Sequence, residues 1–87
     1  MFTLIPANHF LKSYKKLTAQ LQKQIDNKLI LLAKNPNHPS LRTKRIQGTE
    51  RLYESSVNMD VRLIWYYEGD ILIIILDVGH HDILKRF

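Results

Sequence analysis

The spacing of apolar side chains changes along the chain, and each change predicts a different element. Residues 2–5 form a short apolar run that Pro6 ends, typical of a strand because proline cannot donate to a β-ladder. Residues 8–34 carry apolar side chains three or four positions apart, the period of an amphipathic helix. Asn8 and Thr18 are both good N-cap residues, so we expect two helices that form a hairpin.

The second half of the chain has the patterns of strands. Residues 35–39 contain two prolines and two asparagines, which end the helix, and residues 40–48 form a basic connection. Residues 52–57 and 60–67 alternate in polarity, which predicts two strands with one covered face each. After a Glu-Gly-Asp turn, residues 71–78 form an apolar run that only Asp77 interrupts, which predicts the central, covered strand. The chain is expected to leave the sheet at the glycine that follows.

The predicted order is therefore β-α-α-β-β-β. It indicates one α+β domain over residues 1–87, with the helical hairpin packed on one face of a small, largely antiparallel sheet. Trp65, Tyr53 and Tyr67 alternate toward the helices and are expected in the core. Arg62 and Glu54 fall on the other face, which we expect to be open.

Composition narrows the possible partners and cofactors. The 87 residues carry a net charge of +5 and no cysteine. The charge favours an anionic partner: nucleic acid, a membrane surface or an acidic protein. The absence of cysteine leaves only His, Asp and Glu as metal ligands. Since the consecutive His80, His81 and Asp82 suit no common ligand spacing, we expect neither metal nor cofactor. Residues 1–6 lack a basic leader and no apolar run could span a bilayer, so we expect a cytoplasmic protein away from membranes.

An arginine within a strand, near the point where two histidines follow another strand, suits chemistry on an anion. Arg62 is the fixed cation, and imidazoles titrate near neutral pH. Neighbouring side chains of an extended segment point to opposite sides, so only one of His80 and His81 should face the site. A cross-strand ion pair between Arg62 and Glu54 is the alternative role for both residues.

Several segments resemble the RelE/ParE superfamily of toxin–antitoxin toxins in sequence and spacing. They are Ser40-Leu41-Arg42, Ile46-Gln47-Gly48, Tyr53-Glu54, Arg62-Leu63-Ile64-Trp65 and Val78-Gly79-His80-His81-Asp82. The resemblance implies a RelE-like fold and a small cytoplasmic ribonuclease that cuts messenger RNA, usually on the ribosome, and is silenced by a co-expressed antitoxin. A sister branch inhibits DNA gyrase instead.

The resemblance also suggests roles for individual residues. Its Gly-x-His pattern selects His81 as the general acid or base, and a carboxylate such as Glu54 abstracts the 2′-hydroxyl proton in some related toxins. Arg62 would stabilise the charge that develops at phosphorus, because a guanidinium stays charged and fits phosphate in a bidentate way. The expected products are a 2′,3′-cyclic phosphate, or its hydrolysed 3′-phosphate, and a 5′-hydroxyl.

The remaining basic and aromatic candidates would grip RNA: Lys44, Arg45, Arg51, His80, Lys85 and Phe87. The chain departs from the best-known members, which carry lysines where it has Glu54 and Ser56, and often a tyrosine where it has Lys85. The expected partners are an acidic antitoxin, messenger RNA and the ribosome. A gyrase-type toxin without catalysis and an RNA-binding module with a decayed catalytic set remain as alternatives.

Overall fold

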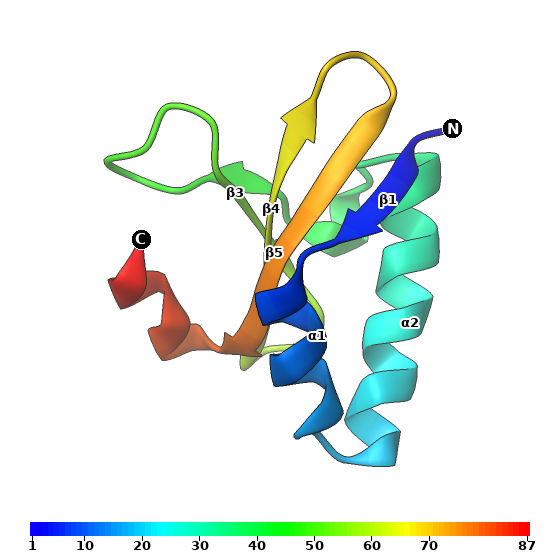
Figure 1. Cartoon of the computed structure of the whole chain (residues 1–87), viewed down its shortest axis with the longest axis vertical. Coiled ribbons are helices and arrows are strands. Elements are labelled where there is room, and N and C mark those ends of the chain that lie inside the picture. The colour runs from blue at the N-terminus through cyan, green and yellow to red at the C-terminus, as the bar shows by residue number, and fades with distance from the viewer.

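The computed structural model describes residues 1–87 and confirms the α+β architecture, with a helical hairpin packed against a five-stranded sheet (Figure 1). The elements follow in this order: β1 (Thr3–Pro6), α1 (Asn8–Lys15), α2 (Ala19–Lys34), the 3₁₀ helix η1 (Pro39–Leu41), β2 (Lys44–Arg45), β3 (Tyr53–Ser56), β4 (Val61–Glu68), β5 (Leu72–His80) and the C-terminal 3₁₀ helix η2 (His81–Arg86).

The strands lie in the order β1-β5-β4-β3-β2. Only the pair β1 and β5 is parallel, so the sheet is largely antiparallel as predicted. β5 lies between β1 and β4 and is therefore an interior strand, but the prediction that it is the central strand was wrong, because β4 holds that position. The predicted order has no strand in the basic connection over residues 40–48, and this was wrong for Lys44–Arg45, which pairs with Glu54 and Tyr53 as β2. A strand of two residues is too short to produce an alternating pattern.

The two helices begin in different ways. The Thr18 hydroxyl accepts a hydrogen bond from the Leu21 amide at 3.2 Å, which confirms Thr18 as the cap of α2. The prediction that Asn8 caps α1 was wrong, because Ala7 occupies that position and Asn8 is the first helical residue. The Ala7 amide instead donates to the Ile75 carbonyl at 2.9 Å, so the helix starts directly from the sheet.

The main core lies between the helical hairpin and the sheet. Phe10 of α1, Ile25 and Leu32 of α2, and Trp65 of β4 are among its buried side chains. Trp65 is fully buried, and Tyr53 stacks on it with 4.9 Å between ring centroids. The predicted aromatic core is therefore confirmed.

The opposite face of the sheet was predicted to be open, and the structure corrects this. Ile64 of β4, Ile46 and Ile83 of η2 form a second buried cluster there. The chain also does not leave the sheet at Gly79, because β5 continues through His80. Gly79 instead makes room for η2: a Cβ atom at this position would lie only 2.6 Å from Ile83 Cγ2. The C-terminal turn thus packs tightly over one end of this face. Figure 1 shows this turn in red, on the side of the sheet away from α2.

None of the helices combines the length and apolar character that crossing a lipid bilayer requires.

Candidate functional site

A hollow of about 440 Å³ lies on the sheet face beside η2. We call it the carboxylate pocket. Its lining consists of Lys44, Arg45, Ile46, Gln47, Glu54, His81 and Leu84. Lys44 and Glu54 are direct cross-strand partners on β2 and β3, so their side chains leave the same face. β2, which was not predicted from the sequence, therefore positions Lys44, which was predicted as an RNA contact.

Glu54 is the only acidic residue of this pocket, and its side chain is just 8% exposed. A buried carboxylate is costly unless it is paired. Arg62 supplies the partner: its Nε atom lies 3.7 Å from Glu54 Oε1, and its side chain is 16% exposed. The ion pair considered from the sequence is therefore present in the structure, and it lies at the border of the pocket.

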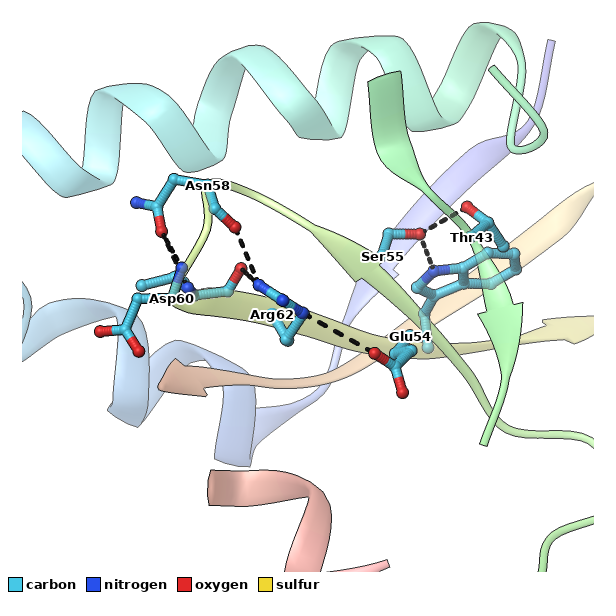
Figure 2. A network of polar contacts seen from close by, with 8 residues as sticks. Thr43, Glu54, Ser55, Asn58, Asp60 and Arg62 are labelled. Carbon is cyan, nitrogen blue, oxygen red and sulfur yellow. Dashed lines mark hydrogen bonds and ion pairs between the residues drawn. The ribbon is translucent and has the colours of Figure 1, made fainter. Parts of the chain in front are cut away.

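The Arg62 guanidinium extends from Glu54 toward the turn between β3 and β4 (Figure 2). Its Nη1 atom donates to the backbone carbonyls of Asn58 at 2.8 Å and Val61 at 3.2 Å. Asn58 is itself fixed, because its Oδ1 atom accepts hydrogen bonds from the amides of Asp60 and Val61, each at 2.8 Å. Arg62 does not line the carboxylate pocket, so it acts on that pocket through Glu54.

The two adjacent histidines lie in different surroundings. His81 is exposed, begins η2 and lines the carboxylate pocket together with Glu54. His80 ends β5, and its Nδ1 atom lies 2.6 Å from Asp60 Oδ2, outside that pocket. The structure thus brings Glu54, His81, Lys44 and Arg45 together and leaves His80 apart.

The other predicted RNA contacts lie outside the pocket. Arg51 stacks over the Tyr66 ring at 4.3 Å and pairs with Glu68 at 2.9 Å, so its charge is already matched. Lys85 is exposed on η2 without an ion pair. Phe87 is 37% exposed, and its amide donates to the Leu84 carbonyl at 3.1 Å.

A polar cluster surrounds Asp77, and none of its residues was predicted as a functional group from the sequence. This carboxylate is 1% exposed and accepts hydrogen bonds from the Ser13 hydroxyl at 2.7 Å and the Val78 amide at 2.8 Å. Its Oδ2 atom has no hydrogen bond but lies 3.1 Å from His9 Nε2 and 3.7 Å from Arg86 Nη1. His9 is therefore a structural partner of Asp77. The polar residue inside an apolar strand was the available signal.

A second missed network fixes Trp65 behind the site. Its Nε1 atom donates to the Ser55 hydroxyl at 2.9 Å, and this hydroxyl also lies 2.7 Å from Thr43 Oγ1 (Figure 2). Ser55 is fully buried. The contacts join β3 and β4 to the segment that leads into β2, and so they hold Lys44 opposite Glu54.

The fold is shared with several solved toxins. A toxin from Helicobacter pylori, in a copper-bound mutant form, is 22% identical, with a TM-score of 0.75 over 97% of this chain and 99% of that one. YafQ from Escherichia coli is 20% identical, with a TM-score of 0.75 over 97% and 98%. RelE in the RelE–RelB complex of Pyrococcus horikoshii is 18% identical, with a TM-score of 0.75 over 91% and 93%. No curated protein matches the sequence.

The sequence itself also matches a family model. Residues 4–84 match the model described as the ParE toxin of type II toxin–antitoxin systems, parDE. The match covers nearly the whole chain and agrees with the segments that carry the resemblance and with the fold of the solved toxins. The chain therefore belongs to the ParE toxin family of type II toxin–antitoxin systems, within the RelE/ParE superfamily.

Proposed function

We propose that this toxin is an endoribonuclease that cleaves messenger RNA without a metal ion, in association with the ribosome. The observation that carries the proposal is the carboxylate pocket, in which a carboxylate, an imidazole and two cations line one hollow: Glu54, His81, Lys44 and Arg45. Cleavage of RNA requires removal of the 2′-hydroxyl proton, stabilisation of negative charge at phosphorus, and protonation of the leaving 5′-oxygen. The pocket offers a group for each task.

In this mechanism Glu54 accepts the 2′-hydroxyl proton, and the 2′-oxygen attacks the adjacent phosphorus. His81 donates a proton to the 5′-oxygen as the P–O bond breaks. The products are a 2′,3′-cyclic phosphate and a 5′-hydroxyl. Lys44 and Arg45 neutralise the charge on the phosphoryl oxygens, while Arg62 orients Glu54 and adds positive charge beside it.

The experiment compares growth arrest and RNA cleavage for three single variants. Glu54→Gln and His81→Ala should each lower the cleavage rate by about 10²–10⁴-fold, the usual contribution of a proton-transferring group. His80→Ala is the matched control, since it removes the neighbouring imidazole and should keep most of the activity. Circular dichroism checks that all three fold. If folded Glu54→Gln and His81→Ala both arrest growth as the wild type does, the catalytic assignment is wrong.

Inhibition of DNA gyrase without catalysis is the second candidate, and the family match favours it because the matched model is that of ParE. The two functions predict different damage. A ribonuclease stops translation and leaves plasmid supercoiling intact at first, whereas a gyrase inhibitor relaxes plasmids and induces the DNA-damage response. Following both readouts after induction distinguishes the candidates.

The proposed partner is an acidic antitoxin encoded with the toxin. Two observations support it: the chain carries 13 Lys and Arg residues against 8 Asp and Glu residues, and structures with the same fold were solved as the RelE–RelB and DinJ–YafQ complexes. We expect an acidic segment that folds on docking. Co-purification with the product of a neighbouring short acidic gene tests this, and a toxin that remains harmless without any partner contradicts it.

A further inference from the structure

A second hollow of about 430 Å³ lies on the far side of the Glu54–Arg62 pair from the carboxylate pocket. We call it the basic pocket. Its cations are Lys28 of α2, Arg42 after η1, and Arg62 of β4. No acidic side chain lines it, and its remaining polar groups are Ser40, Ser56 and Asn58. Residues from four parts of the fold thus direct positive charge and hydroxyl groups into one space.

The pocket exists because β2 is short. β2 covers the outer edge of β3 only at Tyr53 and Glu54, so no strand pairs with that edge at Ser56. The chain reaches β2 through Arg42, whose φ of 48° and ψ of 44° turn it through the left-handed region. The turn between β3 and β4 closes the other side, and its Asn58 also binds Gln24 of α2 at 2.9 Å (Nδ2 to Oε1).

Two of the three cations have no carboxylate partner. Neither Lys28 nor Arg42 forms an ion pair, although Lys28 is half-buried. Arg62 is paired with Glu54 only through Nε, at 3.7 Å. Lys28 and Arg62 are partly shielded from water, whereas Arg42 is exposed. The three cations together lack matching negative charge, and an anion that enters the pocket would supply it.

The geometry points to one chemical class of ligand. We propose that the basic pocket binds a phosphate and its ribose from a single-stranded polynucleotide, one step along the strand from the nucleotide in the carboxylate pocket. The pocket is larger than a phosphate alone needs and lies within the size range of small-molecule sites. Glu54 lines one pocket and Arg62 the other. Their contact (Figure 2) makes the two hollows adjacent, so one strand can cross the pair and occupy both.

Met59 adds a surface for a base. Its side chain is 96% exposed at the rim of the basic pocket, where the β3–β4 turn presents it to solvent. A polarisable thioether makes favourable contacts with aromatic rings, and every nucleobase has such a face. This contact is tolerant of sequence, so the pocket is expected to bind RNA without reading its bases.

The inference rests on the proposed ribonuclease function for its ligand, and binding measured apart from cleavage tests it. The probe is a short single-stranded DNA, which lacks the 2′-hydroxyl and cannot be cut by this chemistry. Its dissociation constant is measured by fluorescence anisotropy over a range of salt concentrations. The variants are Arg42→Gly and Lys28→Gln. Lys23→Gln, an exposed lysine of the same helix outside the pocket, is the matched control.

Arg42→Gly gives the sharpest result because folding and binding should move independently. Glycine adopts the left-handed conformation without a Cβ penalty, so the melting temperature should stay the same or rise. Binding should nevertheless weaken, and the slope of log K against log[salt] should become shallower by about 0.7 for one lost phosphate contact on a single strand. Lys28→Gln should give a similar change and Lys23→Gln none. If Arg42→Gly and Lys28→Gln bind the probe as the wild type does, or the wild type does not bind it, the proposal is overturned.

An acidic peptide is the competing occupant, so binding of a poly-glutamate peptide is measured with the same variants. A loss confined to the peptide assigns the pocket to a protein and contradicts the proposal. The test also separates the two proposals from each other. If the wild type has no ribonuclease activity but Arg42→Gly lowers DNA affinity, the binding role of the basic pocket stands and the ribonuclease function is wrong. If the wild type cleaves RNA but Arg42→Gly leaves DNA affinity unchanged, the ribonuclease function stands and the binding role is wrong.

Discussion

Replacing Gly79 by alanine should force the C-terminal turn away from the sheet. Gly79 does not have a positive φ, so its backbone accepts alanine. The added methyl carbon would lie 2.6 Å from Ile83 Cγ2. Carbon atoms normally pack about 3.5–4.0 Å apart, so Ile83 has to retreat by about 1 Å.

The energetic cost follows from two opposing effects. Overpacking of this kind costs about 1–3 kcal/mol, and alanine in place of glycine within a strand recovers about 0.5–1 kcal/mol. The net loss in free energy of unfolding should lie between about 0 and 2.5 kcal/mol. Because Ile83 lies two residues after His81, the same displacement should move the imidazole relative to Glu54 and weaken growth arrest.

A double-mutant cycle with Ile83→Ala isolates the contact. Ile83 is 6% exposed, so Ile83→Ala alone should cost about 2–5 kcal/mol. The double variant should be more stable than the sum of the single effects predicts, by about 0.5–3 kcal/mol, because the new methyl fills space that the isoleucine has left. Urea unfolding is followed by the fluorescence of the single, fully buried Trp65. Costs that add within about 0.5 kcal/mol would refute the proposed packing.

Three further perturbations test other parts of the structure. Ser55→Ala removes the acceptor of the buried Trp65 Nε1–H and should lower the free energy of unfolding by about 1–3 kcal/mol in urea denaturation; an unchanged midpoint would contradict this. The hydrogen bond that Tyr14 donates to the Asp26 carboxylate raises the pKa of this tyrosine above 10.0. The stabilising effect of this hydrogen bond is therefore complete below pH 10.0 and is lost as the pH rises through the raised pKa. Asp26→Asn should lower the pKa of Tyr14 in a spectrophotometric titration. Asp77→Asn removes the charge that faces the last turn of η2 and should speed amide hydrogen exchange there while α2 exchanges as before.

The elements with long, regular periods were predictable from the sequence. The spacing of apolar residues over residues 8–34 and the alternation of β4 each extend far enough to identify a helix or a strand. The cap at Thr18 was also predictable, since a side-chain acceptor before an apolar run is a local signal. The start of α1 was not predictable in this way. The chain passes directly from β1 into the helix, so Ala7 and not Asn8 occupies the cap position.

The parts that the sequence did not predict depend on contacts between distant residues. Asp77 meets Ser13 and His9 only because α1 packs on β5, and no local pattern encodes that approach. β2 and the basic pocket depend on a single left-handed residue, Arg42, which is not distinguished from its basic neighbours in the sequence. The packing of η2 against the sheet did have a signal in the sequence, namely Gly79, because a glycine within an apolar strand often marks a close approach of another segment. That segment contains Ile83.

The most direct test of the proposed reaction is the chemistry of the RNA ends. Purified toxin is incubated with ribosomes translating a defined message, and the new termini are identified by ligation and phosphatase treatment. The wild type should produce 5′-hydroxyls together with 2′,3′-cyclic phosphates or their hydrolysed 3′-phosphates. His80→Ala should do the same, and Glu54→Gln should produce these ends about 10²–10⁴-fold more slowly. An uncut message together with inhibited gyrase, or 5′-phosphate ends from the wild type, would contradict the mechanism proposed for the carboxylate pocket.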